Sequence, residues 1–347
     1  MARKTIKVFD TTQEQIDKIL PENKELMEDF VNYLEATDHS PKSIKVYISN
    51  INIFFVYLME KAHNKDFVNI KKRDILNFQN YMLKSGLGSA RIKNIRSSIS
   101  SLSNYIESML SDEEEKWENF RNIVSKIPAP NPNTVREKTV LSDEECQKIL
   151  NKLVKLELYQ EACAFALAWS SGRRKSELLR IKRSYIKDEY LQYGSLYKTP
   201  EKIKTKGRGV NGKLLNVYIL KSKFQKYFDL WMKKREEMGI PDDIDEIFVV
   251  KRKGQWCPAD IGKLDYIAEK ISKLFDIDFY FHCLRHNFTT ELLRNKIPAN
   301  VVKGIIGWQS LELVSLYNDA EVDEELGDYF DEGGIKKNIE SGSLNNL

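Results

Sequence analysis

Cysteine is scarce in this chain, and its cysteines do not form pairs. The 347 residues contain four of them, at positions 146, 163, 257 and 283. No two stand at the C-x-x-C spacing of structural zinc sites and redox pairs. A large chain with so few cysteines is not a disulfide-rich secreted scaffold, so we predict reduced and mostly buried thiols.

Long apolar runs are also missing. No segment approaches the roughly 20 consecutive apolar residues that cross a bilayer. The N-terminal residues lack the apolar stretch of a secretory signal. We therefore expect a soluble cytoplasmic protein without a membrane partner.

Neither sign of charge dominates the chain as a whole. Lys and Arg number 55 against 51 Asp and Glu, a net charge of +4 that names no polyanionic partner. The distribution is uneven. Residues 172–236 contain 19 basic and 6 acidic residues, whereas residues 318–347 contain 2 basic and 9 acidic residues. A basic middle suits a phosphate backbone, and a solvated lysine-rich surface accounts for the count equally well.

Proline is infrequent but locally concentrated. Three of the nine prolines stand at positions 128, 130 and 132, where a helix cannot continue. Because one core seldom organises 347 residues, this segment is predicted to join two domains. We predict an N-terminal extension (residues 1–22), a helical domain (23–126), a linker (127–139), a second domain (140–332) and a disordered tail (333–347).

Helical periodicity predicts four helices in the first domain. The pattern begins at residue 23, and Ser40 followed by Pro41 suits the N-cap and first turn of the second helix. The third and fourth helices are predicted over residues 72–84 and 89–109.

The second domain is predicted to be mainly α with one small antiparallel sheet. Ser142 and Glu145 have the spacing of a capping box at its first helix. Residues 190–220 are rich in Tyr, Ile and Val and contain the turn sequence Asn211-Gly212, whereas helical periodicity returns at 221–238 and continues with interruptions to 329. The overall fold class is therefore mainly α (α+β).

Residues suited to phosphate gather in this second domain. Two of the four histidines, His282 and His286, flank Arg285 in a predicted helix start, and Arg174 follows an apolar helix. An arginine fork binds two phosphate oxygens at once and keeps its proton, and a helix start attracts anions. Taken alone, each arginine is more often a surface residue and each histidine more often a structural one.

In order and spacing these residues resemble the tyrosine recombinases of the phage-integrase type, over nearly the whole chain. Family members carry Arg, Lys, His-x-x-Arg, His or Trp, and Tyr in that order, with the Tyr nine positions after the His or Trp. The matching residues here are Arg174, a lysine in the strand turn, His282, Arg285, Trp308 and Tyr317.

The resemblance also selects among neighbouring candidates. The family's arginine stands two residues after a glycine and three before a glutamate, which indicates Arg174 rather than Arg173 and adds Glu177 as a supporting acid. The lysine is predicted to be Lys206, with Lys204 as the alternative, because the strand turn is longer than usual. Two further departures are Arg173 at a usually aliphatic position and Phe281 at a position commonly occupied by proline.

The implied activity is cleavage and rejoining of DNA through a 3′-phosphotyrosyl intermediate. Tyr317 would be the nucleophile, the two arginines would hold the phosphate, and Lys206 would protonate the leaving oxygen. His282 would act in acid–base work, and Trp308 would pack against the site and donate a hydrogen bond to the phosphate. No metal or other cofactor is implied, and His286 is predicted to be structural.

The resemblance further implies a C-shaped clamp of the two domains on double-stranded DNA. It also implies a homo-tetramer on paired sites, through residues 324–330 after the nucleophile. A bacterial cell is the expected host, with a phage or other mobile element as a candidate source. Predicted DNA contacts are Lys42, Lys45, Arg91, Lys93, Arg96, Lys204 and Arg208.

Two alternatives remain open from the sequence. One is a DNA-binding repressor that keeps the integrase fold and does not cleave, for which the departures at Arg173, Phe281 and the strand turn leave room. The other is an enzyme like the type IB topoisomerases, which relaxes DNA without pairing two sites.

Overall fold

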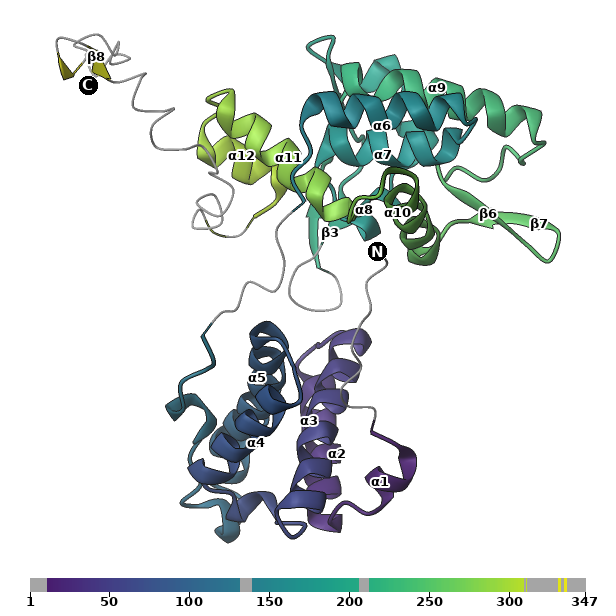
Figure 1. Ribbon diagram of the computed structural model, residues 1–347. Coiled ribbons are helices and arrows are strands. Elements are labelled where there is room, and N and C mark those ends of the chain that lie inside the picture. Colours follow the sequence, from purple (N-terminus) through teal and green to yellow (C-terminus); the bar gives the residue numbers. More distant parts are fainter. Residues whose placement is uncertain are drawn as a thin grey trace. The chain divides into compact units, whose positions relative to one another are not determined.

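The computed structural model describes residues 11–131, 139–205, 212–308, 310, 330–331 and 334–335. This part of the chain divides into two compact units, residues 11–131 and residues 139–205 with 214–308. Each unit has its own hydrophobic core. The fold is mainly helical with small antiparallel sheets, as predicted (Figure 1).

Among the described residues, the first unit contains the four predicted helices and one additional short α-helix. The short helix α1 falls in the predicted extension and begins with a capping box between Thr12 and Gln15. The predicted fourth helix runs through α5 and continues as a π-helical turn, Ile106–Leu110. The helices are α1 (Gln13–Asp17), α2 (Pro21–Ala36), α3 (Pro41–Lys61), α4 (Lys72–Lys84) and α5 (Ser89–Tyr105).

Local sequence signals fix where these helices begin. The hydroxyl of Ser40 accepts a hydrogen bond from the backbone N–H of Ser43 at 3.2 Å, and Pro41 opens α3. This is the predicted cap and first turn, in which proline costs no hydrogen bond. Between the helices, Phe54, Phe67 and Phe78 are fully buried. The ring of Phe54 contacts the rings of both Phe67 and Phe78.

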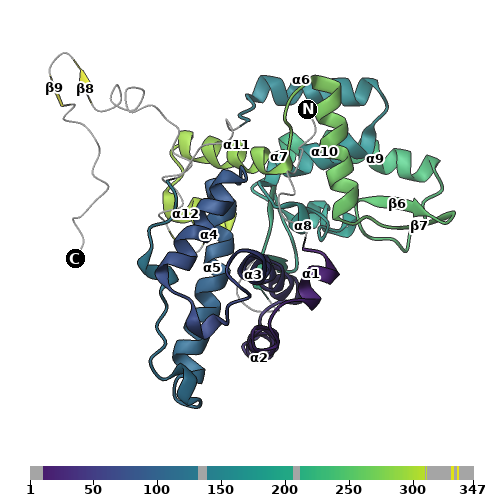
Figure 2. The ribbon, with the colours of Figure 1, turned by 60° about the horizontal axis from the view of Figure 1, so that its bottom comes forward.

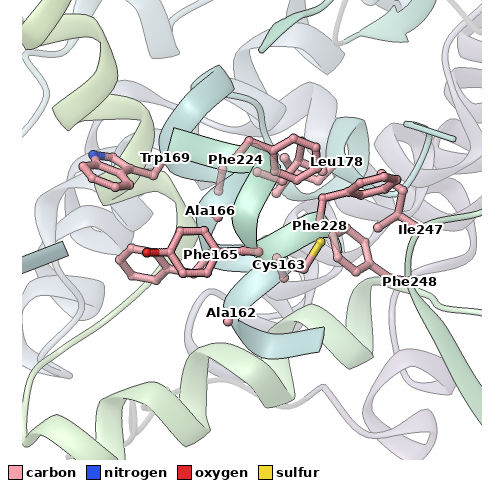
Figure 3. Close-up of a cluster of buried hydrophobic side chains, with 14 of the residues drawn as sticks. Ala162, Cys163, Phe165, Ala166, Trp169, Leu178, Phe224, Phe228, Ile247 and Phe248 are labelled. Atoms are coloured by element: carbon pink, nitrogen blue, oxygen red, sulfur yellow. The ribbon is translucent and has the colours of Figure 1, made fainter. Parts of the chain in front are cut away.

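The second unit is built around α7. Its residues 161–171 are all buried, and it packs against α6, α9 and α11. Side chains from several elements meet there, including Phe165 of α7 and Phe224 and Phe228 of α9 (Figure 3). The helices are α6 (Asp143–Lys155), α7 (Tyr159–Ser171), α8 (Lys175–Leu178), α9 (Lys221–Glu237), α10 (Ile261–Phe275), α11 (Phe281–Arg294) and α12 (Ala299–Ile306).

The capping box predicted at the start of α6 is present. Ser142 Oγ accepts from the backbone N–H of Glu145 at 3.2 Å, and Glu145 Oε2 accepts from the N–H of Ser142 at 2.7 Å. Two backbone donors at the helix start are thereby satisfied. Helices α11 and α12 lie at one end of this unit, and strands β6 (Val249–Arg252) and β7 (Gln255–Pro258) lie at the opposite end (Figures 1 and 2).

The small antiparallel sheet predicted for residues 190–220 is present, and the described residues contain further short strand pairs. Region 190–220 contains a three-stranded antiparallel sheet in the order β1-β2-β5, with Tyr197 opposite Ile219, and a separate pair, β3-β4. A further short pair, β8-β9, lies near the C-terminus. The strands are β1 (Leu191–Gln192), β2 (Leu196–Lys198), β3 (Ile203–Thr205), β4 (Lys213–Leu215), β5 (Tyr218–Leu220), β6 (Val249–Arg252), β7 (Gln255–Pro258), β8 (Phe330–Asp331) and β9 (Gly334–Ile335).

The β6–β7 hairpin corrects the helical prediction for that region. Arg252 pairs with Gln255 across a two-residue turn, and Lys253 and Gly254 both have positive φ, 49° and 83°. Positive φ at both turn positions matches the twist of a tight hairpin. Among the described residues no helix has the length and apolar character needed to cross a membrane.

Candidate active site

The turn between α7 and α8 depends on Gly172. Its φ of 60° and ψ of 23° lie in the left-handed region, and its N–H donates to Ala168 O at 2.9 Å, closing α7. A Cβ at this position would lie 2.6 Å from Cδ1 of Phe288, on α11. Glycine is therefore required at this position for two reasons, the left-handed backbone conformation and the close approach of α11.

Arg174 follows this turn as the N-cap residue of α8. Its Nη1 donates to Glu177 Oε1 at 3.0 Å, and its backbone N–H donates to Glu177 Oε2 at 3.4 Å. The Glu177 side chain is completely buried, whereas 31% of the Arg174 side chain is exposed. One edge of the guanidinium is thus anchored to a buried carboxylate, and the exposed part can meet an anion from solvent.

Arg285 joins three helices inside the protein. It lies on α11 with 1% of its surface exposed. Its Nη1 donates to Gly172 O at 2.9 Å and its Nη2 donates to Ile306 O at 3.2 Å. These carbonyls stand at the ends of α7 and α12, where the negative end of a helix dipole favours a cation. Arg285 thereby holds the Arg174 turn and the end of α12 next to α11.

His282 lies one helical turn before Arg285 and is exposed. Its pKa is lowered from the usual 6.5, first because the surrounding protein displaces water from the ring, and then because the positive charges of Arg285, Arg174 and His286 oppose protonation. The ring is therefore neutral at neutral pH. The charges of both predicted arginines thus act on His282.

Two other predicted residues lie around this cluster. The Trp308 side chain is 4% exposed and packs in a small core with Phe288 and Val302. Its backbone N–H donates to Lys303 O at 3.1 Å, just after α12 ends. His286 is half-buried, and its Nδ1 lies 3.4 Å from Thr290 Oγ1.

The predicted catalytic lysine and the predicted nucleophile lie outside the part of the chain that the structure describes. Lys206, Arg208, Tyr317 and residues 324–329 lie outside the described residues. Lys204, the alternative lysine, is exposed on β3 between two buried residues, and its carbonyl accepts from Arg180 Nη1 at 2.5 Å.

Four of the predicted DNA contacts in the first unit are exposed. Lys42 and Lys45 lie in the first turns of α3, and Arg91 and Lys93 lie near the start of α5. Arg91 Nη1 donates to Oδ1 of buried Asn50 at 2.6 Å, which ties it to α3.

Arg96 occupies a different place from the one predicted. Only 6% of it is exposed. Its Nη1 donates to Pro128 O at 2.8 Å, and its Nη2 donates to Val124 O at 3.0 Å and Ile127 O at 2.5 Å. The guanidinium also donates to Gln79. Because these acceptors occupy it inside the unit, Arg96 is withdrawn from the proposed DNA contacts.

Two residues that were not among the predicted site residues hold the site together. Asn287 Nδ2 donates to Leu141 O at 2.7 Å, and its Oδ1 accepts from Trp169 Nε1 at 3.0 Å, which fixes α11 against α7. Arg173 is 1% exposed and donates to Ile305 O on α12. The sequence signals for Arg173 were its position directly beside Arg174 and its place where the family resemblance leads one to expect an aliphatic residue, and an arginine by itself does not indicate burial.

Metal-binding residues do not gather near this cluster or elsewhere in the described ranges. Within those ranges no group of three or more His, Cys, Asp or Glu side chains could hold a metal ion.

Comparison with known families matches both units. Residues 139–324 match the model of the phage integrase family, and residues 26–113 match the phage integrase N-terminal SAM-like domain. The chain is 28% identical over 232 residues to the SPbeta prophage-derived recombinase-like protein YomM of Bacillus subtilis, covering 67% of this chain and 68% of that protein. It is 24% identical over 297 residues to the tyrosine recombinase XerA of Pyrococcus horikoshii, and the match covers 85% of this chain and 89% of that protein.

Solved structures share the fold at low sequence identity. The Tn1549 transposon integrase in complex with transposon right end DNA has a TM-score of 0.63 and 15% identity, covering 88% of this chain and 98% of that one. The XerH site-specific recombinase, bound to a palindromic difH substrate in a post-cleavage complex, has a TM-score of 0.62 and 20% identity. The match covers 92% of this chain and 89% of that one. Both likenesses concern the fold.

Proposed function

Because this chain belongs to the phage integrase family, we propose that it is a site-specific tyrosine recombinase that cleaves and rejoins double-stranded DNA. The observation that carries the proposal is the pairing of two arginines around one histidine. Arg285 bonds the carbonyl of the turn that bears Arg174, and the charges of both arginines lower the pKa of His282. Two guanidinium groups beside a neutral imidazole would form a site for one phosphodiester.

The proposed reaction begins with Tyr317. Its hydroxyl oxygen attacks the phosphorus, the P–O5′ bond breaks, and a 3′-phosphotyrosyl link and a free 5′-hydroxyl result. Lys206, with Lys204 as the alternative, gives a proton to the departing 5′-oxygen, and the neutral ring of His282 suits it to accept the proton of the tyrosine. A 5′-hydroxyl of another strand reverses the step, so the energy of the broken bond is conserved.

The proposed reaction uses no metal ion. Arg174, Arg285 and the lysine supply the positive charge that opposes the charge developing on the phosphate, and Trp308 adds a hydrogen bond. Cleavage is accordingly expected to continue in the presence of EDTA.

We further propose that the first unit completes the grip on DNA. Exposed Lys42, Lys45, Arg91 and Lys93 would contact phosphates, and Lys204 and Arg208 would do so from the second unit. The two units would form a clamp around the duplex. Residues 324–330, with apolar side chains among acids, would reach a neighbouring protomer and close a tetramer on paired sites.

A suicide substrate tests the proposal. Duplexes that the protein binds would be selected from a random library and nicked close to each candidate phosphate, so that cleavage releases a short strand and the covalent complex cannot reverse. The wild-type protein is expected to form a complex that survives denaturing electrophoresis. Tyr317→Phe is expected to bind the same duplex and form none.

One observation favours a second candidate, a DNA-binding protein that does not cleave. Arg285 is 1% exposed and its Nη1 and Nη2 donate to backbone carbonyls, so the guanidinium must become accessible before it can hold a phosphate. If the wild-type protein binds the selected duplexes tightly and traps none of the nicked substrates, this second function replaces the first.

A further inference from the structure

We propose that Arg173 is a positioning residue that couples the Arg174 turn to the end of α12, and so fixes where Trp308 stands. The proposal rests on the proposed function, in which Arg174 and Trp308 act on one phosphate. Arg173 stands between Gly172 and Arg174, and it is the only residue that separates the turn glycine from the predicted catalytic arginine.

The Arg173 side chain reaches from this turn to α12. The side chain is completely buried, and its Nη2 donates to Ile305 O. The next carbonyl, that of Ile306, accepts from Arg285. Two arginines from different parts of the chain therefore hold consecutive carbonyls at the C-terminal end of α12, where the helix dipole attracts cations.

Gly307 extends this contact toward Trp308. Its φ is 80°, and a Cβ on it would lie 3.9 Å from Arg173 Nη1 and 2.5 Å from Cδ1 of Leu215 on β4. The left-handed glycine thus fits closely between β4 and the guanidinium. Because Trp308 follows directly, a change in the position of Arg173 is transmitted to Trp308 through one residue.

Arg173 also shares a carboxylate with Arg174. Glu177 Oε2 lies 3.9 Å from Arg173 Nη1, while Glu177 Oε1 accepts from Arg174 Nη1 at 3.0 Å. When the guanidinium of Arg174 turns toward a phosphate, Arg173 stays beside the buried carboxylate and compensates its charge. The guanidinium of Arg173 therefore keeps the Glu177 carboxylate in place while Arg174 changes its orientation.

Stability does not explain this arginine. Its Nε and Nη1 have no hydrogen-bond partner among the described residues. Burial lowers the pKa of Arg173 to about 10, so the group still carries its charge at neutral pH. A buried charge with incomplete hydrogen bonding is commonly less stable than an apolar side chain of similar volume. The site, rather than the core, is the reason for an arginine here.

The first test measures α12 directly and needs no activity. The N–H groups of Gly307 and Trp308 donate to Lys303 O at 2.8 and 3.1 Å, so their hydrogen exchange reports the end of α12. We expect Arg173→Leu to exchange at residues 299–308 at least about tenfold faster than wild type, and Arg173→Lys to restore most of the protection. Unchanged exchange in Arg173→Leu would overturn the proposal.

Arg235 supplies a matched control. It is also a buried arginine of this unit, 3% exposed, and it donates to the carbonyls of Ile244, Glu246 and Ile247. Arg235→Leu should lower the stability of the unit without a selective increase in exchange at α12. Equal increases in both variants would reduce Arg173 to an ordinary structural residue and sink the inference.

The second test uses the suicide substrate. At saturating DNA we expect Arg173→Leu to form the covalent complex about 100-fold more slowly than wild type, with an unchanged Kd for the duplex, because a misplacement of about 1 Å suffices for such a loss. Arg173→Lys should recover much of the rate. A wild-type rate in Arg173→Leu contradicts the positioning role. If the wild-type protein itself traps nothing, the proposed recombinase function fails, and the exchange measurement still decides the placement of Trp308.

Discussion

Among single residues, Gly172 has the most direct control over the site, because its left-handed backbone lets α7 end and Arg174 begin α8. Gly172→Ala is expected to destabilise the second unit by about 3 kcal/mol, from left-handed strain and from overlap with Phe288. Gly239→Ala is the matched control. Its φ is 64° and nothing lies within 4 Å of the added Cβ, so it should cost only about 1 kcal/mol. Equal losses in chemical denaturation would show that the contact with Phe288 is unimportant.

His282 offers a second measurement at this scale. Because its pKa is lowered, the ring should remain neutral to a lower pH than a free histidine does. Titration of the imidazole protons by NMR, assigned by comparison with His282→Gln, should give a midpoint below 6.5. Bound DNA should raise that midpoint, since a phosphate favours the charged ring. A midpoint of 6.5 or above in the free protein would contradict the described electrostatics.

At the level of elements, two of the three basic residues on α5 have opposite roles. Arg96 ties α5 to carbonyls of residues 124–128, whereas Lys93 is exposed. Arg96→Met should lower the free energy of unfolding of the first unit by about 3 kcal/mol, because buried carbonyls lose a charged donor.

Lys93→Gln is the partner experiment. This substitution should change the free energy of unfolding of the first unit by less than about 0.5 kcal/mol. It should weaken DNA binding and reduce the slope of log affinity against log salt concentration by about one. Stability loss in Lys93→Gln with none in Arg96→Met would reverse both assignments.

On the scale of the whole molecule, the two hydrophobic cores share no buried residue. We therefore expect two unfolding transitions in calorimetry of the intact protein. Arg96→Met should shift only the transition of the first unit. Ser142→Ala, which removes the cap of α6 and costs about 1 kcal/mol, should shift only that of the second. A common shift from both substitutions would indicate one cooperative molecule.

Local signals made much of the helical fold predictable. The caps at Ser40 and Ser142 act on backbone groups within three residues, so the sequence near them contains all the needed information. The β6–β7 hairpin was missed because its strands are four residues each and its turn, Lys253-Gly254, is not among the strongest turn sequences. Short strands draw their stability from distant partners, which a local pattern does not reveal.

The sequence by itself determined the order and spacing of the candidate site, because these follow from residue identity along the chain. Arg174, His282, Arg285, Trp308 and Tyr317 could be named from it. Only the tertiary structure decided which arginines face solvent. Arg96 and Arg173 are buried because carbonyls far away in the sequence, at 124–128 and at 305, come within reach once the helices pack. Hydrogen bonds of that kind depend on where other helices end, and no pattern beside an arginine specifies them.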